Sequence, residues 1–233
     1  MGKIYKDYLN KSQTFWNGNS SMYPSHSHGY EVAVFNSTTK FQQESPGGLV
    51  VLGFNPSGAK LGTSASTLIS GTPGTSSAFY EYDPFVNRPK VFDTYTKAVQ
   101  QFAIDCGYSN NYYKLDAFGI IEKTQNKLEK NINSNPSLYD PVFELPISAI
   151  VQLKPKVVVF ANAGLRRLII VNQLFKNFIN CKWNTNKCAY DITLTDCNGN
   201  THTCYGIFTT MLSGVHPIDK GSRGIIVQVI KNL

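Results

Sequence analysis

The sequence carries little charge and lacks any long apolar run. Only 16% of its 233 residues are Asp, Glu, Lys or Arg, so uncharged polar side chains must form much of the surface. No apolar stretch approaches the roughly 18 residues that a membrane-spanning helix needs. Residues 1–7 lack the apolar centre of a secretory signal. We therefore expect a cytoplasmic protein with no membrane partner.

The sequence also lacks the spacings of common metal and phosphate sites. Its five cysteines form no Cys-x-x-Cys pair, and His26 and His28 lie in a Ser-, Pro- and Gly-rich stretch typical of an exposed loop. Residues 70–77 contain glycines and serines without the Gly-Lys-Ser/Thr of a P-loop. We expect no metal and no cofactor. Because no secretory signal is predicted, the cysteines should be reduced thiols.

The positive charge is concentrated in the last third of the chain. The net charge is +7, and residues 151–233 hold ten basic against three acidic side chains, whereas residues 1–150 are balanced. Such asymmetry favours a polyanionic partner. Charge that merely keeps the protein soluble is the alternative.

Strand-like and helix-like segments alternate along most of the chain. Apolar runs predict strands over residues 49–54, 112–121 and 155–161, and apolar periodicity predicts helices over 92–106, 140–153 and 162–179. Asn198-Gly199 predicts a hairpin of residues 190–195 and 201–208, whose second arm would continue as a strand ending at His216.

This alternation predicts an α/β protein, a single three-layer α/β/α domain around a mainly parallel four-stranded sheet. Residues 46–233 would form the domain. Residues 1–45 read as an irregular N-terminal arm packed on it, and we expect a monomer.

Two strands are predicted to end in a polar residue beside a proline. Asn55-Pro56 follows residues 49–54, and His216-Pro217 closes the strand after the hairpin. Ligands of open α/β sheets bind at the carboxyl ends of strands, so the two could share one pocket. Asn55 offers an acceptor and a donor but no strong base, and His216 can donate to a developing oxyanion or exchange a proton near neutral pH.

These two segments resemble the motifs of the uracil-DNA glycosylase superfamily. Gly53-Phe54-Asn55-Pro56 matches the Gly-x-Asn-Pro form of the mismatch-specific and single-strand-selective branches, and His216-Pro217 matches the second motif. The order of predicted elements also matches, so the resemblance covers residues 48–230. It implies an enzyme that flips a uracil or related deaminated base out of DNA and hydrolyses its N-glycosidic bond without a metal.

The resemblance also implies residue roles. Asn55 would position the attacking water, and His216 would stabilise charge on the departing base. The backbone of Phe54 and Ser57 would contact the base edge, and the ring of Phe79 or Tyr80 would stack on the base. The loop after His216 would enter the DNA helix or grip phosphates through Ile218, Lys220, Gly221, Ser222 and Arg223.

The chain departs from the family pattern at two positions. Asp116 stands where the family often has an Asn that reads the base, and Ile218 stands where a Ser usually follows the second motif. An ionised Asp116 accepts hydrogen bonds only and would suit a base that presents N–H groups, whereas a protonated Asp116 could also donate. Two alternatives stay open: a catalytically silent nucleic-acid-binding relative, and an α/β enzyme acting on a small anionic ligand.

Overall fold

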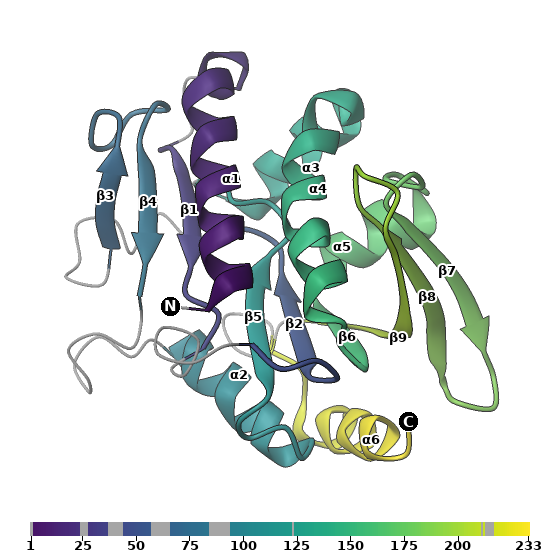
Figure 1. The fold of residues 1–233 in the computed structure, drawn as a ribbon. Helices are drawn as coiled ribbons and strands as arrows, with labels where there is room; N and C mark the ends of the chain where they lie inside the picture. The colour runs from purple at the N-terminus through teal and green to yellow at the C-terminus, as the bar shows by residue number, and fades with distance from the viewer. Residues whose placement is uncertain are drawn as a thin grey trace.

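The computed structural model of the protein describes residues 2–23, 28–36, 44–56, 66–83, 94–122, 124–210, 212 and 217–233 (Figure 1). These residues form helices packed around a six-stranded sheet, with a smaller three-stranded sheet beside it. The predicted α/β class is thereby confirmed. Within the described part of the chain, no helix is both long enough and apolar enough to span a bilayer.

The main sheet has the strand order β5-β2-β6-β9-β8-β7. Four neighbouring strands are parallel: β5 (Tyr112–Asp116), β2 (Leu49–Gly53), β6 (Val157–Ala161) and β9 (Thr201–Thr209). The hairpin turn returns β8 (Ala189–Thr195) antiparallel to β9, and β7 (Ile179–Asn184) pairs antiparallel with β8. The prediction of a four-stranded sheet is therefore wrong, because the hairpin adds two further strands to one edge.

Helices cover both faces of this sheet, which is compatible with a three-layer α/β/α arrangement. Side chains alternate along β2, so that Val50 and Leu52 join the buried cluster of α1 (Lys3–Asn19) and α4 (Pro136–Leu153). Leu49 and Val51 join the cluster of α2 (Thr94–Asp105) and α6 (Lys220–Lys231) on the other face. Figure 1 shows α2 and α6 together below the sheet and α1, α3 and α4 above it.

The prediction of an irregular N-terminal arm is wrong. Residues 3–19 form the 17-residue helix α1, which buries Tyr5, Tyr8, Ser12 and Trp16 on one face. Their spacing of three or four residues is helical. The stripe consists of aromatic and hydroxyl side chains, so it lacks the aliphatic periodicity that reveals a helix in sequence. The three aromatic residues belong to the main buried core.

The smaller sheet has the order β1-β4-β3 and joins the edge of the main sheet. Its strands are β1 (Tyr30–Ala33), β4 (Phe79–Tyr82) and β3 (Ser66–Ser70), none of which the sequence predicted. The Glu31 amide donates to the Gly119 carbonyl at 2.7 Å, and the Lys114 amide donates to the Phe35 carbonyl at 3.0 Å. The smaller sheet thus connects to β5 and to the segment that follows it.

Several predicted boundaries also change. The helix predicted over residues 162–179 ends earlier: α5 (Ala163–Arg166) continues as one wider turn (Arg167–Val171), and β7 follows. Helix α3 (Gln125–Ser134) was not predicted, and α4 starts at Pro136. Strand β9 ends at Thr209, and the predicted continuation to His216 falls largely outside the described residues.

Candidate functional site at the carboxyl edge of the parallel strands

Asn55 is held in one orientation just beyond the end of β2. Its Nδ2 donates to the Pro56 carbonyl at 3.0 Å and to the Ile120 carbonyl at 3.3 Å. Two acceptors on that side fix the amide nitrogen there, since an oxygen in its place would face two carbonyls. The buried Oδ1 atom has no hydrogen-bond partner among the described residues. The side chain therefore presents a free acceptor.

Asp116 lies at the same edge as Asn55. It is the last residue of β5 and the register partner of Gly53, two residues before Asn55. A Cβ on Gly53 would lie 2.4 Å from the Asp116 Oδ1 and 3.2 Å from the Tyr95 hydroxyl. An added Cβ at this position would therefore displace the Asp116 carboxylate from its place over the end of β2.

A buried lysine accompanies Asp116. Lys114 is two residues earlier on β5, so its side chain leaves the same face of the strand. Its ammonium is 3.9 Å from the Asp116 Oδ2 and 5.4 Å from the centre of the Tyr95 ring, and its side chain is only 4% exposed. A buried cation needs an opposite charge, which Asp116 supplies. Sequence reasoning missed Lys114, and its place on an otherwise apolar strand two residues before Asp116 was the available signal.

The other residues predicted to contact a base differ in how they are placed. Phe54 is buried, its ring centre 5.4 Å from that of Phe118, and its carbonyl accepts from the Phe118 amide at 2.9 Å. That carbonyl is therefore already engaged. Ser57 lies outside the described residues.

The two candidate stacking rings are both packed within the protein. Phe79 is fully buried and stacks on Tyr30 with ring centres 5.8 Å apart. Tyr80 is 5% exposed, and its hydroxyl accepts from the Gly74 amide at 2.9 Å. In this conformation neither ring is open to a base.

The predicted DNA-contacting residues lie at the start of α6. Asp219 caps this helix by accepting from the Ser222 amide at 2.9 Å. Hydrogen bonding from the Ser222 hydroxyl, and then from its amide, lowers the pKa of the Asp219 carboxyl group. Arg223 forms an ion pair with Asp105 at 2.6 Å, so its charge is already partly compensated. Lys220 is exposed, and Ile218 packs partly against the α2–α6 cluster.

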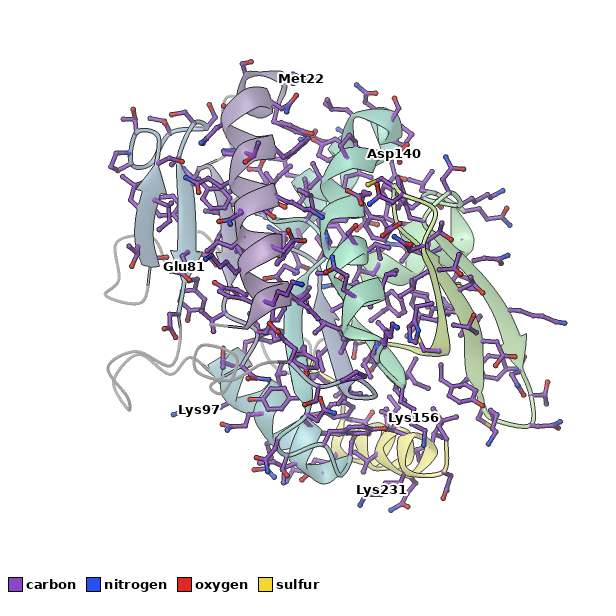
Figure 2. All side chains as sticks on the ribbon, viewed as in Figure 1. Met22, Glu81, Lys97, Asp140, Lys156 and Lys231 are labelled. Atoms are coloured by element: carbon purple, nitrogen blue, oxygen red, sulfur yellow. The ribbon has the colours of Figure 1, made fainter. Side chains whose placement is uncertain are left out.

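Two open grooves flank α6. One, of about 480 Å³, is lined by Lys220, Arg223 and Lys231, and Figure 2 shows Lys231 near the carboxyl end of the helix. The other, of about 650 Å³, lies between Gly221 of α6 and Lys187 in the turn after β7. The predicted phosphate-contacting residues therefore line surface grooves. His216 lies outside the described residues, so its relation to Asn55 stays a prediction.

No group of three or more His, Cys, Asp or Glu side chains suited to a metal occurs among the described residues. A scan against models of protein families finds none that matches this chain, and a search of curated proteins finds no match either.

Proposed function

We propose that the protein is a DNA base-excision glycosylase that hydrolyses the N-glycosidic bond of a flipped uracil or related deaminated base. One observation carries this proposal. Asn55 is anchored through its amide nitrogen at the carboxyl edge of the parallel strands, and its carbonyl oxygen is left without a partner among the described residues. An oriented, buried acceptor is suited to hold a single water beside a sugar.

The proposed hydrolysis does not require Asn55 to act as a base. As the bond from the sugar C1′ to the base nitrogen breaks, its electrons leave with the base and the sugar carbon becomes electron-poor. The water held by Asn55 bonds to that carbon and releases a proton, which neutralises the departing base. In this scheme His216 donates to the base oxygen as negative charge develops there.

The Lys114–Asp116 pair supports a particular class of base. A carboxylate at Asp116 accepts from an N–H at the edge of the base. Its neighbouring ammonium, 3.9 Å away, places a donor next to that acceptor. A deaminated purine or pyrimidine presents an N–H beside a carbonyl, the pattern that such a pair complements.

A lesion-panel assay tests the proposal. Purified protein is incubated with oligonucleotides that carry uracil, hypoxanthine or xanthine, in single strands and in duplexes, and released base is measured directly. We expect release of at least one base. Binding of the panel without release of any base would instead favour the catalytically silent nucleic-acid-binding relative. The absence of a carboxylate in Gly53-Phe54-Asn55-Pro56 is the sequence feature that favours this alternative.

The third candidate, an enzyme acting on a small anionic ligand, is separated by the same experiment. It predicts neither release of a base nor binding of the oligonucleotides.

A further inference from the structure

Four aromatic side chains form a continuous row across the β6–β9–β8–β7 part of the main sheet. Phe160 and Phe208 stack with ring centres 4.3 Å apart and planes 9° apart. Tyr190 meets Phe208 edge-on at 5.3 Å, and Trp183 meets Tyr190 at 5.1 Å with a 70° angle between the planes. We call these four residues the aromatic row.

The aromatic row passes from the core to solvent. Phe160 is fully buried, Phe208 and Tyr190 are partly buried, and Trp183 is 50% exposed. Trp183 continues the ring surface of Tyr190 into solvent, and aromatic residues are enriched at contact surfaces. Figure 1 shows β7 and β8 at the side of the sheet opposite α1 and the smaller sheet.

The strand register places this row at the same edge of the sheet as Asn55. Phe160 pairs with Leu52 of β2 on one side and with Phe208 on the other, both near the carboxyl ends of their strands. Tyr190 pairs with Trp183 across the β7–β8 hairpin, next to the turn at that edge. The row therefore leads away from the candidate site toward the free edge of β7.

The stretch of chain that carries Phe160, Trp183 and Tyr190 has only basic residues among its charged residues as far as Tyr190. Residues 145–190 contain no Asp or Glu and seven basic residues, namely Lys154, Lys156, Arg166, Arg167, Lys176, Lys182 and Lys187. Arg167 is paired with Glu129 by two hydrogen bonds of 2.6 Å. Asp191, the first acidic residue after this stretch, leaves β8 on the face opposite Tyr190 and accepts from the Asn184 side chain at 3.0 Å.

A groove of about 350 Å³ adjoins the row. It lies between the helical turn after α5 and strand β7, with the Tyr190 ring and Lys176 among its lining residues. Lys176 is exposed. Lys182, next to Trp183, leaves β7 on the opposite face, where it is the register partner of Asp191. The surface on the Trp183 side therefore combines exposed ring area, a groove and the positive charge of Lys176.

We propose that the exposed end of the aromatic row, Tyr190 and Trp183 with Lys176, binds single-stranded nucleic acid. Unstacked bases offer flat apolar faces that pack on aromatic rings, and their phosphates contact nearby lysines. A duplex hides those faces between its base pairs, so the row favours single strands. This site does not depend on base excision, although a strand bound there would run along the edge that holds Asn55.

The two tryptophans of the chain allow a direct test. Trp16 is fully buried, whereas Trp183 is half exposed, so a base stacking on Trp183 quenches only the solvent-accessible part of the fluorescence. The probe is an undamaged oligothymidine of about 12 nucleotides, titrated at low salt into the full-length protein. We expect the oligothymidine to quench the fluorescence saturably. The quenched part should be the emission that iodide also quenches, which comes from Trp183, whereas the emission of buried Trp16 should persist.

Variants distinguish base stacking on Trp183 from general electrostatic attraction of the phosphates. The affinity of each variant is measured by the fluorescence anisotropy of a labelled oligothymidine. Trp183→Leu keeps an apolar side chain and should weaken binding about fivefold or more, whereas Trp183→Phe should recover part of that loss. Lys176→Gln should lower the slope of log affinity against log salt by about 0.7. Met22→Ala, which removes a 59% exposed side chain at a distant point labelled in Figure 2, should change nothing.

Three outcomes would overturn the proposal. The first is that the oligothymidine does not quench Trp183, and the second is that a Trp183→Leu variant, still folded by circular dichroism, binds as tightly as the unmodified protein. The third is that poly-glutamate binds equally or more tightly and gives the same quenching. The last outcome would assign the surface to an acidic protein partner. Because the probe carries no damaged base, failure of this proposal leaves the base-excision proposal untouched, and the reverse also holds.

Discussion

The two ends of the main sheet differ in how their functional side chains are held. At the β5–β2 end, the Asn55 amide is anchored by two carbonyls and Lys114 is buried beside Asp116. At the β8–β7 end, Trp183 is half exposed and Lys176 is exposed. Fixed polar groups suit a reaction that needs one geometry, whereas exposed rings and exposed cations suit a ligand of variable sequence.

The largest stability effect should come from breaking the buried pair. Lys114→Met removes the cation beside Asp116 and should lower the free energy of unfolding by about 3 kcal/mol, because a buried charge is left uncompensated. Urea unfolding measures this. The double variant Lys114→Met with Asp116→Leu should recover much of the loss.

The matched control is the exposed pair of Lys11 and Asp7, whose charged atoms lie 3.0 Å apart. Both side chains are more than two-fifths exposed, so solvent screens them and Lys11→Met should change the free energy of unfolding by less than about 1 kcal/mol. Equal losses of unfolding free energy for Lys114→Met and Lys11→Met would contradict the claim that the Lys114–Asp116 pair is buried and the Lys11–Asp7 pair is screened by solvent.

A smaller effect is expected at the glycine beneath Asp116. Gly53→Ala would place a methyl group 2.4 Å from the Asp116 Oδ1, so the carboxylate must move and stability should fall by about 1–3 kcal/mol. Gly18→Ala is the control: no atom lies within 4 Å of its added Cβ, and an alanine within α1 should stabilise the protein by about 0.5–1 kcal/mol. Thermal melts of both variants give the comparison. Identical shifts at the two glycines would mean that Asp116 is not constrained as described.

The smallest effect is a pH dependence at the start of α6. The pKa of Asp219 is lowered by hydrogen bonds from the Ser222 hydroxyl and then from the Ser222 amide, so the carboxylate stabilises the helix start above its unfolded pKa. This contribution is lost as the pH falls through the lowered folded pKa. The protection factors of the first-turn amides of α6, taken relative to the intrinsic exchange rate at each pH, should therefore fall on acidification. Asp219→Asn keeps a capping side chain and should remove that fall, which would persist if Asp219 were not its source.

The sequence predicts those parts of the fold whose secondary structure depends mainly on the residues of one short segment. Strands β2 and β6 are buried at every position and read as apolar runs, and Asn198-Gly199 marks the turn between β8 and β9. Helix α1 escapes prediction because its buried stripe consists of Tyr5, Tyr8, Ser12 and Trp16, which sequence patterns treat as surface-compatible.

The candidate site is only partly visible in the sequence for the same reason. Asn55 and Asp116 stand at the ends of predictable strands, and their shared edge follows from parallel pairing. The burial of Lys114 depends on how α2 brings Tyr95 over the ammonium, a contact between segments far apart in the chain. Likewise, β7 has one buried residue, Ile179, and two consecutive exposed residues, Lys182 and Trp183, so neither the strand nor the role of Trp183 in the aromatic row can be predicted from residues 179–184 alone.

The most direct test of the central claim compares Asn55→Ala with Asn10→Ala, which removes an exposed amide on α1. Both variants are assayed under single-turnover conditions with the oligonucleotide from which the unmodified protein releases a base. We predict that base release by Asn55→Ala falls about 100-fold or more, with substrate binding retained, and that Asn10→Ala is unaffected. Turnover by Asn55→Ala at the rate of the unmodified protein would contradict the assignment of Asn55 as the residue that holds the attacking water.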